Sequence, residues 1–235
     1  MHPDLSKLLD LQAKDIAIAE ADARIAAVDA DVAVLDRELD RARGARDTAQ
    51  RAAADGARRR DELESKIESF RQVQERRRQR LEFVRNPKDA STLMAEMDLA
   101  RSALAKEEGD WVRSADTVDA LEGRVGEEEQ KLLGVEAEQL PRRTELAERR
   151  AQLEVERDEL VRQREEAASL LERTLRIRYD RLRKARASAV VVPLSGDACG
   201  ACFTAVPRNR RSQIRSGALL EGCEACGVIL YAAES

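Results

Sequence analysis

Apolar residues recur in alternating steps of three and four along the first third of the chain. Positions spaced in this way share one stripe of an α-helix, and a stripe sustained over about ten heptads is typical of a coiled coil. Its members, some polar or small, are Leu11, Lys14, Ile18, Ala21, Ile25, Val28, Val32, Leu35, Leu39, Ala42, Arg46, Ala49, Ala53, Gly56, Arg60, Leu63, Ile67, Phe70, Gln74, Arg77, Leu81 and Val84. The small residues from Ala42 to Gly56 predict close helix approach or local looseness.

The stripe stops after Val84 and resumes at Leu93. Asn86 precedes Pro87 and is biased away from the helical basin, so the first helix should end there. The second stripe runs through Leu93, Met97, Ala100, Leu104, Trp111, Val118, Leu121, Val125, Leu132, Val135, Leu146, Leu153, Leu160, Ala167, Leu170 and Ile177. Two long stripes joined by a short turn predict an antiparallel hairpin. We expect a helix over about 4–85, a turn over about 86–92 and a helix over about 93–186.

Helix-breaking residues interrupt the second arm. Pro141 removes a backbone donor and predicts a kink, and Gly123, Gly126 and Gly134 lower helix propensity nearby. Two interpretations stay open, a helix that is merely bent and a functional hinge. Trp111 lies on the stripe, so we expect its burial between the arms.

Composition agrees with long helices. Charged residues make up 37% of the 235 residues and aromatic residues only 3%, so a large aromatic-rich core is excluded. The net charge of -4 identifies no partner. No apolar run approaches the length of a membrane span, and we expect a cytoplasmic protein with no membrane partner.

Four cysteines lie near the carboxyl end as two Cys-x-x-Cys pairs. Cys199 and Cys202 form the first pair, and Cys223 and Cys226 form the second. This spacing predicts one structural zinc ion held by four thiolates, a closed shell that leaves no position for substrate. Disulfides would be expected in a secreted protein, and redox chemistry of the thiols is the other alternative. His2 is the only histidine and no phosphate-binding glycine loop occurs, so we expect neither an enzyme nor a small-molecule substrate.

Residues 187–235 predict a small β module around these cysteines. We expect strands at 189–194, 203–206 and 228–231 and a helical turn or loop at 209–215. Pro193 suggests an edge position for the first strand. The predicted fold is therefore mainly α, a long antiparallel coiled-coil helical hairpin (1–186) followed by a small β zinc ribbon domain (187–235).

At the level of motifs the chain resembles a family of bacterial C4-type zinc ribbon proteins with an N-terminal coiled-coil hairpin. The resemblance is most specific in Cys199-Gly-Ala-Cys202 and in the run from Cys223 to Tyr231. Val228 stands where the family commonly has arginine, and residues 88–97 lack the tyrosine common near the family's hairpin tip. The resemblance implies a non-enzymatic cytoplasmic factor that binds protein partners and nucleic acid.

Basic residues cluster beside the cysteines. Residues 176–215 contain ten positive and two negative side chains, a local charge of +8 in an acidic chain. Lys/Arg patches of this kind bind phosphate backbones, and we expect nucleic acid, with RNA favoured, as the partner. The expected contacts are Arg181, Arg183, Lys184, Arg186, Arg208, Arg210, Arg211 and Arg215.

Three points remain open about these surfaces. A charge run is often a solvated helix end, and the alternative function is a protein-binding scaffold or chaperone that does not contact nucleic acid. Phe203 and Tyr231 fit either base stacking or packing within the ribbon, and packing is favoured. A second basic cluster lies at the hairpin tip and comprises Arg71, Arg76, Arg77, Arg78, Arg80, Arg85 and Lys88.

Overall fold

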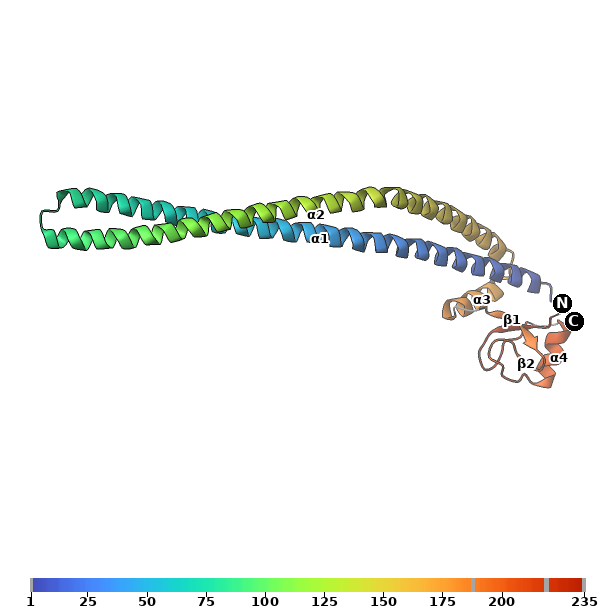
Figure 1. Cartoon of the computed structure of the whole chain (residues 1–235). Coiled ribbons are helices and arrows are strands. Elements are labelled where there is room, and N and C mark those ends of the chain that lie inside the picture. Colours follow the sequence, from blue (N-terminus) through green and yellow to red (C-terminus); the bar gives the residue numbers. More distant parts are fainter. Residues whose placement is uncertain (1, 187–188, 218–219, 234–235) are drawn as a thin grey trace. The chain divides into compact units, whose positions relative to one another are not determined.

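The computed structural model describes residues 2–186, 189–217 and 220–233 and consists mainly of long helices (Figure 1). Helix α1 spans Leu5–Phe83 and helix α2 spans Pro87–Ser169. The chain divides into two compact units. Unit 1 comprises Met1–Val32 and Thr144–Ser235, and unit 2 comprises Ala33–Arg143. The helical hairpin with a small carboxyl-terminal sheet confirms the predicted fold class. No helix in the described parts of the chain is both long and apolar enough to span a membrane.

The turn between the two long helices is shorter than expected. It comprises residues 84–86, and α2 begins at Pro87 rather than near residue 93. Proline is favoured at the first helical position, where its missing N–H would lack a helical partner in any case. The side chain of Asn86 accepts a hydrogen bond from the Lys88 amide at 3.0 Å, as an N-cap residue does.

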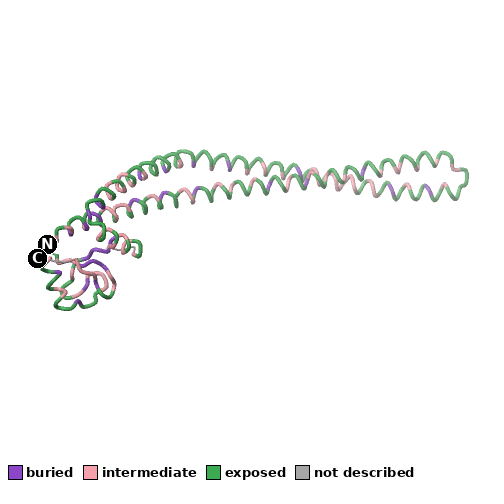
Figure 2. The backbone as a smooth tube through the Cα atoms, turned by 180° about the vertical axis from the view of Figure 1, so that it is seen from behind, coloured by how far each residue is buried: buried purple, intermediate pink, exposed green. Residues whose placement is uncertain are grey.

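Burial along the arms follows the predicted stripe. Buried and half-buried residues recur at regular intervals along both long helices in Figure 2, and Ala21, Val28 and Leu35 are buried one heptad apart. Close approach is confirmed at Gly56, where an added Cβ would lie 3.1 Å from Leu121 Cδ1. Trp111 is half-buried. Helix α2 continues unbroken through Pro141.

Ion pairs and hydrogen bonds between α1 and α2 recur every seven residues from Asp15 to Gln50, and one more in the same register lies at Arg71. We call this set the heptad ladder. In unit 1 it joins Asp15 to Arg164 (3.2 Å), Asp22 to Arg157 (3.1 Å) and Asp29 to Arg150 (2.9 Å). In unit 2 it joins Asp36 to Arg143 (2.7 Å), Arg43 to Glu136 (3.5 Å), Gln50 to Glu129 (3.2 Å) and Arg71 to Glu108 (2.7 Å). Acidic residues thus lie on α1 in the first four rungs, and the sign reverses afterwards.

The second arm is not one helix as far as residue 186. Helix α2 ends at Ser169, and a separate helix α3 begins at Arg173 and ends at Ala185. The break moves Leu170 and Ile177 out of the seam, and they are 66% and 57% exposed. Glu172 caps α3 by accepting a hydrogen bond from the Thr174 amide at 3.3 Å.

The four-cysteine module contains a three-stranded sheet and a short helix. Strands β1 (Val191–Ser195), β2 (Ala198–Cys199) and β3 (Ile229–Tyr231) are ordered β2-β1-β3. Strand β1 pairs antiparallel with β2 and parallel with β3, and helix α4 spans Arg208–Ser216. The expected strand over 203–206 is wrong, because that segment forms only an isolated bridge between Ala198 and Ala205. The expected start of the module at residue 187 falls outside the described residues.

Pro193 lies in the central strand, so its expected edge position is wrong. It is tolerated there because it lies opposite Tyr231, the last residue of β3, where the ladder ends. Its carbonyl still accepts a hydrogen bond from the Gly200 amide at 3.1 Å.

One hydrophobic core joins the helices of unit 1 to the sheet. It contains Leu5, Leu8 and Leu11 of α1, Ala167, Ala168 and Leu171 at the end of α2, Tyr179 of α3, and Val190, Val191 and Ile229. Gln12 adds polar contacts, since its side chain accepts from the Val190 and Val191 amides and donates to the Val191 carbonyl at 2.7–2.9 Å. The module therefore depends on α1 for part of its core.

Candidate metal centre and basic surface

Two equivalent turns present the four cysteines. Cys199 ends β2 and Cys202 follows in the next turn, whereas Cys223 and Cys226 flank a turn that precedes β3. In both turns the amide of the residue after the second cysteine closes the loop. Phe203 donates to the Cys199 carbonyl at 2.9 Å, and Gly227 donates to the Cys223 carbonyl at 2.7 Å. The Ala201 amide also donates to Cys199 Sγ at 3.4 Å. Such turns point both side chains of a pair to one side.

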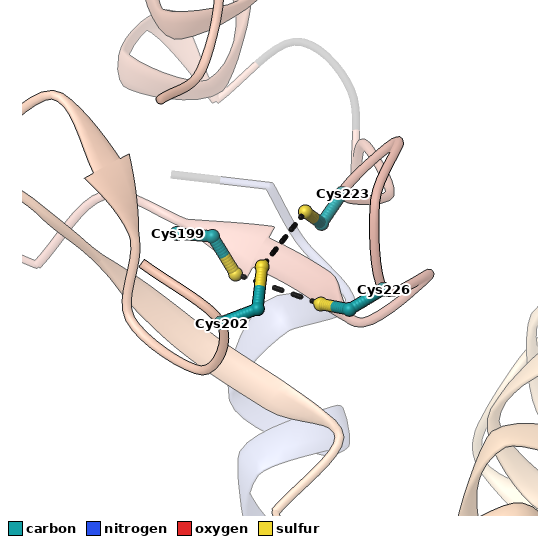
Figure 3. Close-up of side chains that lie close together, drawn as sticks. All are labelled: Cys199, Cys202, Cys223 and Cys226. Atoms are coloured by element: carbon teal, nitrogen blue, oxygen red, sulfur yellow. Dashed lines mark hydrogen bonds between the residues drawn. The ribbon is translucent and has the colours of Figure 1, made fainter. Parts of the chain in front are cut away.

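The four thiols converge on one point (Figure 3). All four sulfur atoms lie within 4.8 Å of one another. Cys199 Sγ lies 3.8 Å from Cys226 Sγ, and Cys202 Sγ lies 3.6 Å from Cys223 Sγ. A disulfide requires about 2.05 Å, and all four cysteines are free. The cluster confirms that these predicted residues come together, and it could hold one metal ion.

The thiols differ in acidity. Hydrogen bonds from the Thr204 hydroxyl and amide lower the pKa of Cys202 to about 6. Burial raises the pKa of Cys226 to about 12. Thiolates are the metal-binding form, and a bound cation favours deprotonation of all four cysteines. Cys202 is therefore the ligand best prepared to bind first.

Helix α4 carries four of the predicted basic residues, and three of them form ion pairs within the module. Arg210 bridges Glu221 and Glu224 at 2.6 Å each. Arg211 pairs with Asp197, and Arg215 lies 3.9 Å from the same carboxylate. Arg208, at the start of α4, makes no ion pair with any described residue.

The basic residues around α3 also fall into two groups, those that contact groups of the same chain and those that do not. Arg183 donates to the carbonyls of Arg186 and Asp15 at 3.0 and 3.5 Å, and Arg186 donates to the Cys226 carbonyl at 2.6 Å. Arg181 and Lys184 have no ion pair among the residues that the structure describes. They line an open hollow of about 610 Å³ on one face of α3 together with Ile177, Asp180 and Ala185.

Phe203 is exposed, so the expectation that it packs within the module is wrong. Its side chain is 74% exposed, and its φ of 58° lies in the left-handed region. Gly227 occupies the corresponding place in the second turn with φ 79°. Tyr231, by contrast, is half-buried and packs against the core of unit 1, which agrees with the packing interpretation.

A buried polar cluster was missed at the sequence level. The fully buried Tyr179 donates to Asp15 Oδ2 at 2.7 Å, and Arg164 binds Asp15 and also Asp180. Burial, reinforced by Asp15, raises the pKa of Tyr179. The residues come from three helices, and only the heptad spacing of Asp15, Asp22 and Asp29 could have indicated one of them.

Comparisons with known proteins support the fold alone. No family model and no curated protein matches the chain. Three solved bacterial structures are similar. CT398 from Chlamydia trachomatis has 20% sequence identity and a TM-score of 0.71, with 96% of this chain and 99% of that chain covered. HP0958 from Helicobacter pylori has 15% identity and a TM-score of 0.52, with 96% and 98% covered. A protein from Mycobacterium smegmatis has 19% identity and a TM-score of 0.56, with 95% and 98% covered.

Proposed function

We propose that the four cysteines bind one structural zinc ion. A tetrahedral ion with bonds of about 2.3 Å to sulfur separates its ligands by about 3.8 Å, close to the sulfur–sulfur distances of 3.6 and 3.8 Å. Four thiolates complete the shell, so the ion stabilises the module and leaves no position for substrate. Elemental analysis of the isolated protein should return about one zinc per chain. An equal amount of iron in its place would contradict the assignment.

We further propose that the protein is a non-enzymatic cytoplasmic adaptor that binds nucleic acid, with RNA favoured. The main support for this proposal is that Arg181 and Lys184 share one open face of α3 and have no ion pair within the described structure. Arg208 is a third such cation, and the exposed ring of Phe203 could stack on an unpaired base. This contact set is smaller than the eight residues expected from the sequence.

A charge-reversal experiment tests this function. The double variant Arg181→Glu/Lys184→Glu should weaken retention of single-stranded RNA in a salt-graded mobility assay. It should also reduce the salt slope by about 1.4, because each lost contact to a single strand contributes about 0.7. Arg142→Glu/Arg149→Glu, which changes the charge equally at two exposed positions of α2, is the matched control. The proposal fails if the unmodified protein retains no RNA or DNA even at low salt.

A protein-binding scaffold is the second candidate. Five of the eight predicted phosphate contacts, namely Arg183, Arg186, Arg210, Arg211 and Arg215, are engaged by carboxylates or carbonyls of the same chain. Carboxylates neutralise Arg210, Arg211 and Arg215, and all five arginines hold the module together through contacts within the chain. This candidate predicts no retention of nucleic acid by the unmodified protein.

A further inference from the structure

Unpaired cations accumulate at the hairpin tip in unit 2. Residues 76–88 carry six positive side chains and one negative side chain, Glu82. Only Arg77 among the six forms an ion pair within the described structure, with Glu96 at 3.8 Å. Arg76 donates to the Gln72 carbonyl in its own helix, which leaves its charge unneutralised. Elsewhere in the hairpin the heptad ladder pairs several arginines with carboxylates of the other helix, so the tip differs in how many neighbouring cations have no carboxylate partner.

Exposed apolar side chains accompany these cations. Phe83, the last residue of α1, is 82% exposed, and Met94 in the second turn of α2 is 56% exposed. Arg76, Arg80 and Phe83 follow one another in steps of four and three, so they share one face of the last turns of α1. We call Arg76, Arg78, Arg80, Phe83, Arg85, Lys88 and Met94 the tip surface.

The residue types favour a protein partner over a nucleic acid. Aromatic residues and methionine are enriched at protein–protein interfaces, and Phe83 and Met94 are both exposed at the tip surface. Methionine adapts to apolar surfaces of varied shape. A phosphate backbone would satisfy the cations and leave the Met94 side chain without an apolar partner.

We propose that the tip surface binds an acidic segment of another protein that carries a large apolar side chain. Phe83 contacts that apolar side chain, and Asp or Glu residues of the segment face Arg76 and Arg80. Charge complementarity supports this partner, because the tip surface is the part of the hairpin with the most cations lacking an internal carboxylate. The proposal names a partner for the adaptor, but it does not depend on nucleic-acid binding by α3.

Selection from a random peptide library displayed on phage, with the full-length zinc-loaded chain as bait, tests the proposal. Selected peptides should be enriched in Asp and Glu around Leu, Phe or Trp. Binding of one synthetic, fluorescently labelled peptide is then measured by anisotropy. Phe83→Ala should weaken it about tenfold or more, as loss of an interface anchor does. Arg80→Glu should weaken it and also reduce its salt dependence.

Matched controls separate this site from other exposed positions. Val112→Ala removes another exposed apolar side chain of unit 2, and Arg59→Glu reverses another exposed charge on α1, so both should leave peptide binding unchanged. Arg181→Glu/Lys184→Glu should also leave peptide binding unchanged. This variant therefore distinguishes a failure of the tip proposal from a failure of the nucleic-acid proposal. Selected peptides without acidic enrichment, or equal binding by the Phe83→Ala variant, would overturn the proposal. The proposal would also be overturned if Phe83→Ala and Arg80→Glu lost RNA retention and kept peptide binding.

Discussion

Phe203 occupies a backbone conformation that glycine adopts at the corresponding place in the second turn. Its φ is 58° and that of Gly227 is 79°, and both amides close their turns onto the first cysteine of the pair. A bulky residue in the left-handed region costs on the order of 1–2 kcal/mol. Because the ring is exposed, packing within the module does not offset this cost. We take this uncompensated strain as support for the proposed contact of the Phe203 ring with RNA.

Phe203→Gly should therefore separate stability from binding. The variant should unfold at the same temperature as the unmodified zinc-loaded protein or a higher one, because the strain is relieved. Its RNA affinity should fall by about 1–3 kcal/mol, the usual contribution of one stacked base. Phe203→Leu keeps the strain and loses the stacking, so it should lose affinity without gaining stability. A large loss of stability in Phe203→Gly would instead indicate a packing role.

Cys202 should be the first thiol to react in metal-free protein. Its pKa of about 6 makes it mostly thiolate at neutral pH, whereas burial protects Cys199 and Cys223 and raises the pKa of Cys226 to about 12. Peptide mass spectrometry after brief iodoacetamide treatment should find Cys202 modified first. The rate should fall about tenfold between pH 7 and pH 5, because the thiolate fraction falls as pH drops through the pKa. Equal rates at all four cysteines would indicate that the metal-free module unfolds.

At the scale of elements, the heptad ladder specifies how α1 and α2 align. Apart from the part-buried pair of Asp15 and Arg164, the rungs are exposed, and each exposed rung contributes little by itself. A slip by one heptad would nevertheless place Asp36 of α1 opposite Glu136 of α2. The change of sign after the fourth rung therefore disfavours the alternative alignment. Apolar stripes do not distinguish such slips, since every heptad presents a similar stripe.

Exchange of one rung tests this role. Asp29→Arg and Arg150→Asp should each lower the melting temperature, because each places like charges together. The double variant restores an opposite-charge pair and should recover most of the loss. Asp31→Arg, at an exposed position of α1 outside the ladder, is the control for a change in net charge. Additive losses in the double variant would show that Asp29 and Arg150 do not interact.

The seams of the hairpin could be predicted from the sequence because their period depends only on local spacing. The break after Ser169 could not, because Leu170 and Ile177 continue the pattern of threes and fours. The helix ends there because Leu171 and Tyr179 pack into a shared core, and this packing overrides the local pattern. The convergence of four thiols was readable from their spacing, whereas ion pairing of Arg210 and Arg211 required the positions of Glu221 and Asp197 in space.

At the scale of the whole molecule, unit 1 joins segments from both ends of the chain. Gln12 satisfies the amides of Val190 and Val191 and the Val191 carbonyl across 178–179 residues of sequence. Gln12→Leu leaves these groups without their partner, and each such loss costs about 1–3 kcal/mol. We expect a lower free energy of unfolding in urea. Gln152→Leu, at an exposed position of α2 in the same unit, should have little effect.

Removal of the zinc ion that we propose should affect the two units differently. Zinc binding supplies folding free energy to a small module, so chelation should open the four-cysteine module. The core that contains Val191 and Ile229 also contains Leu8 and Tyr179, so protection should fall in these parts of α1 and α3 as well. Unit 2 contains none of these residues and has its own seam and ladder rungs, so its amides should keep their protection.

Hydrogen exchange with mass spectrometry, before and after chelation, measures both effects. Loss of protection confined to residues 189–233 would show that the sheet contributes nothing to the helices of unit 1, and loss throughout 33–143 would show that the units do not unfold separately.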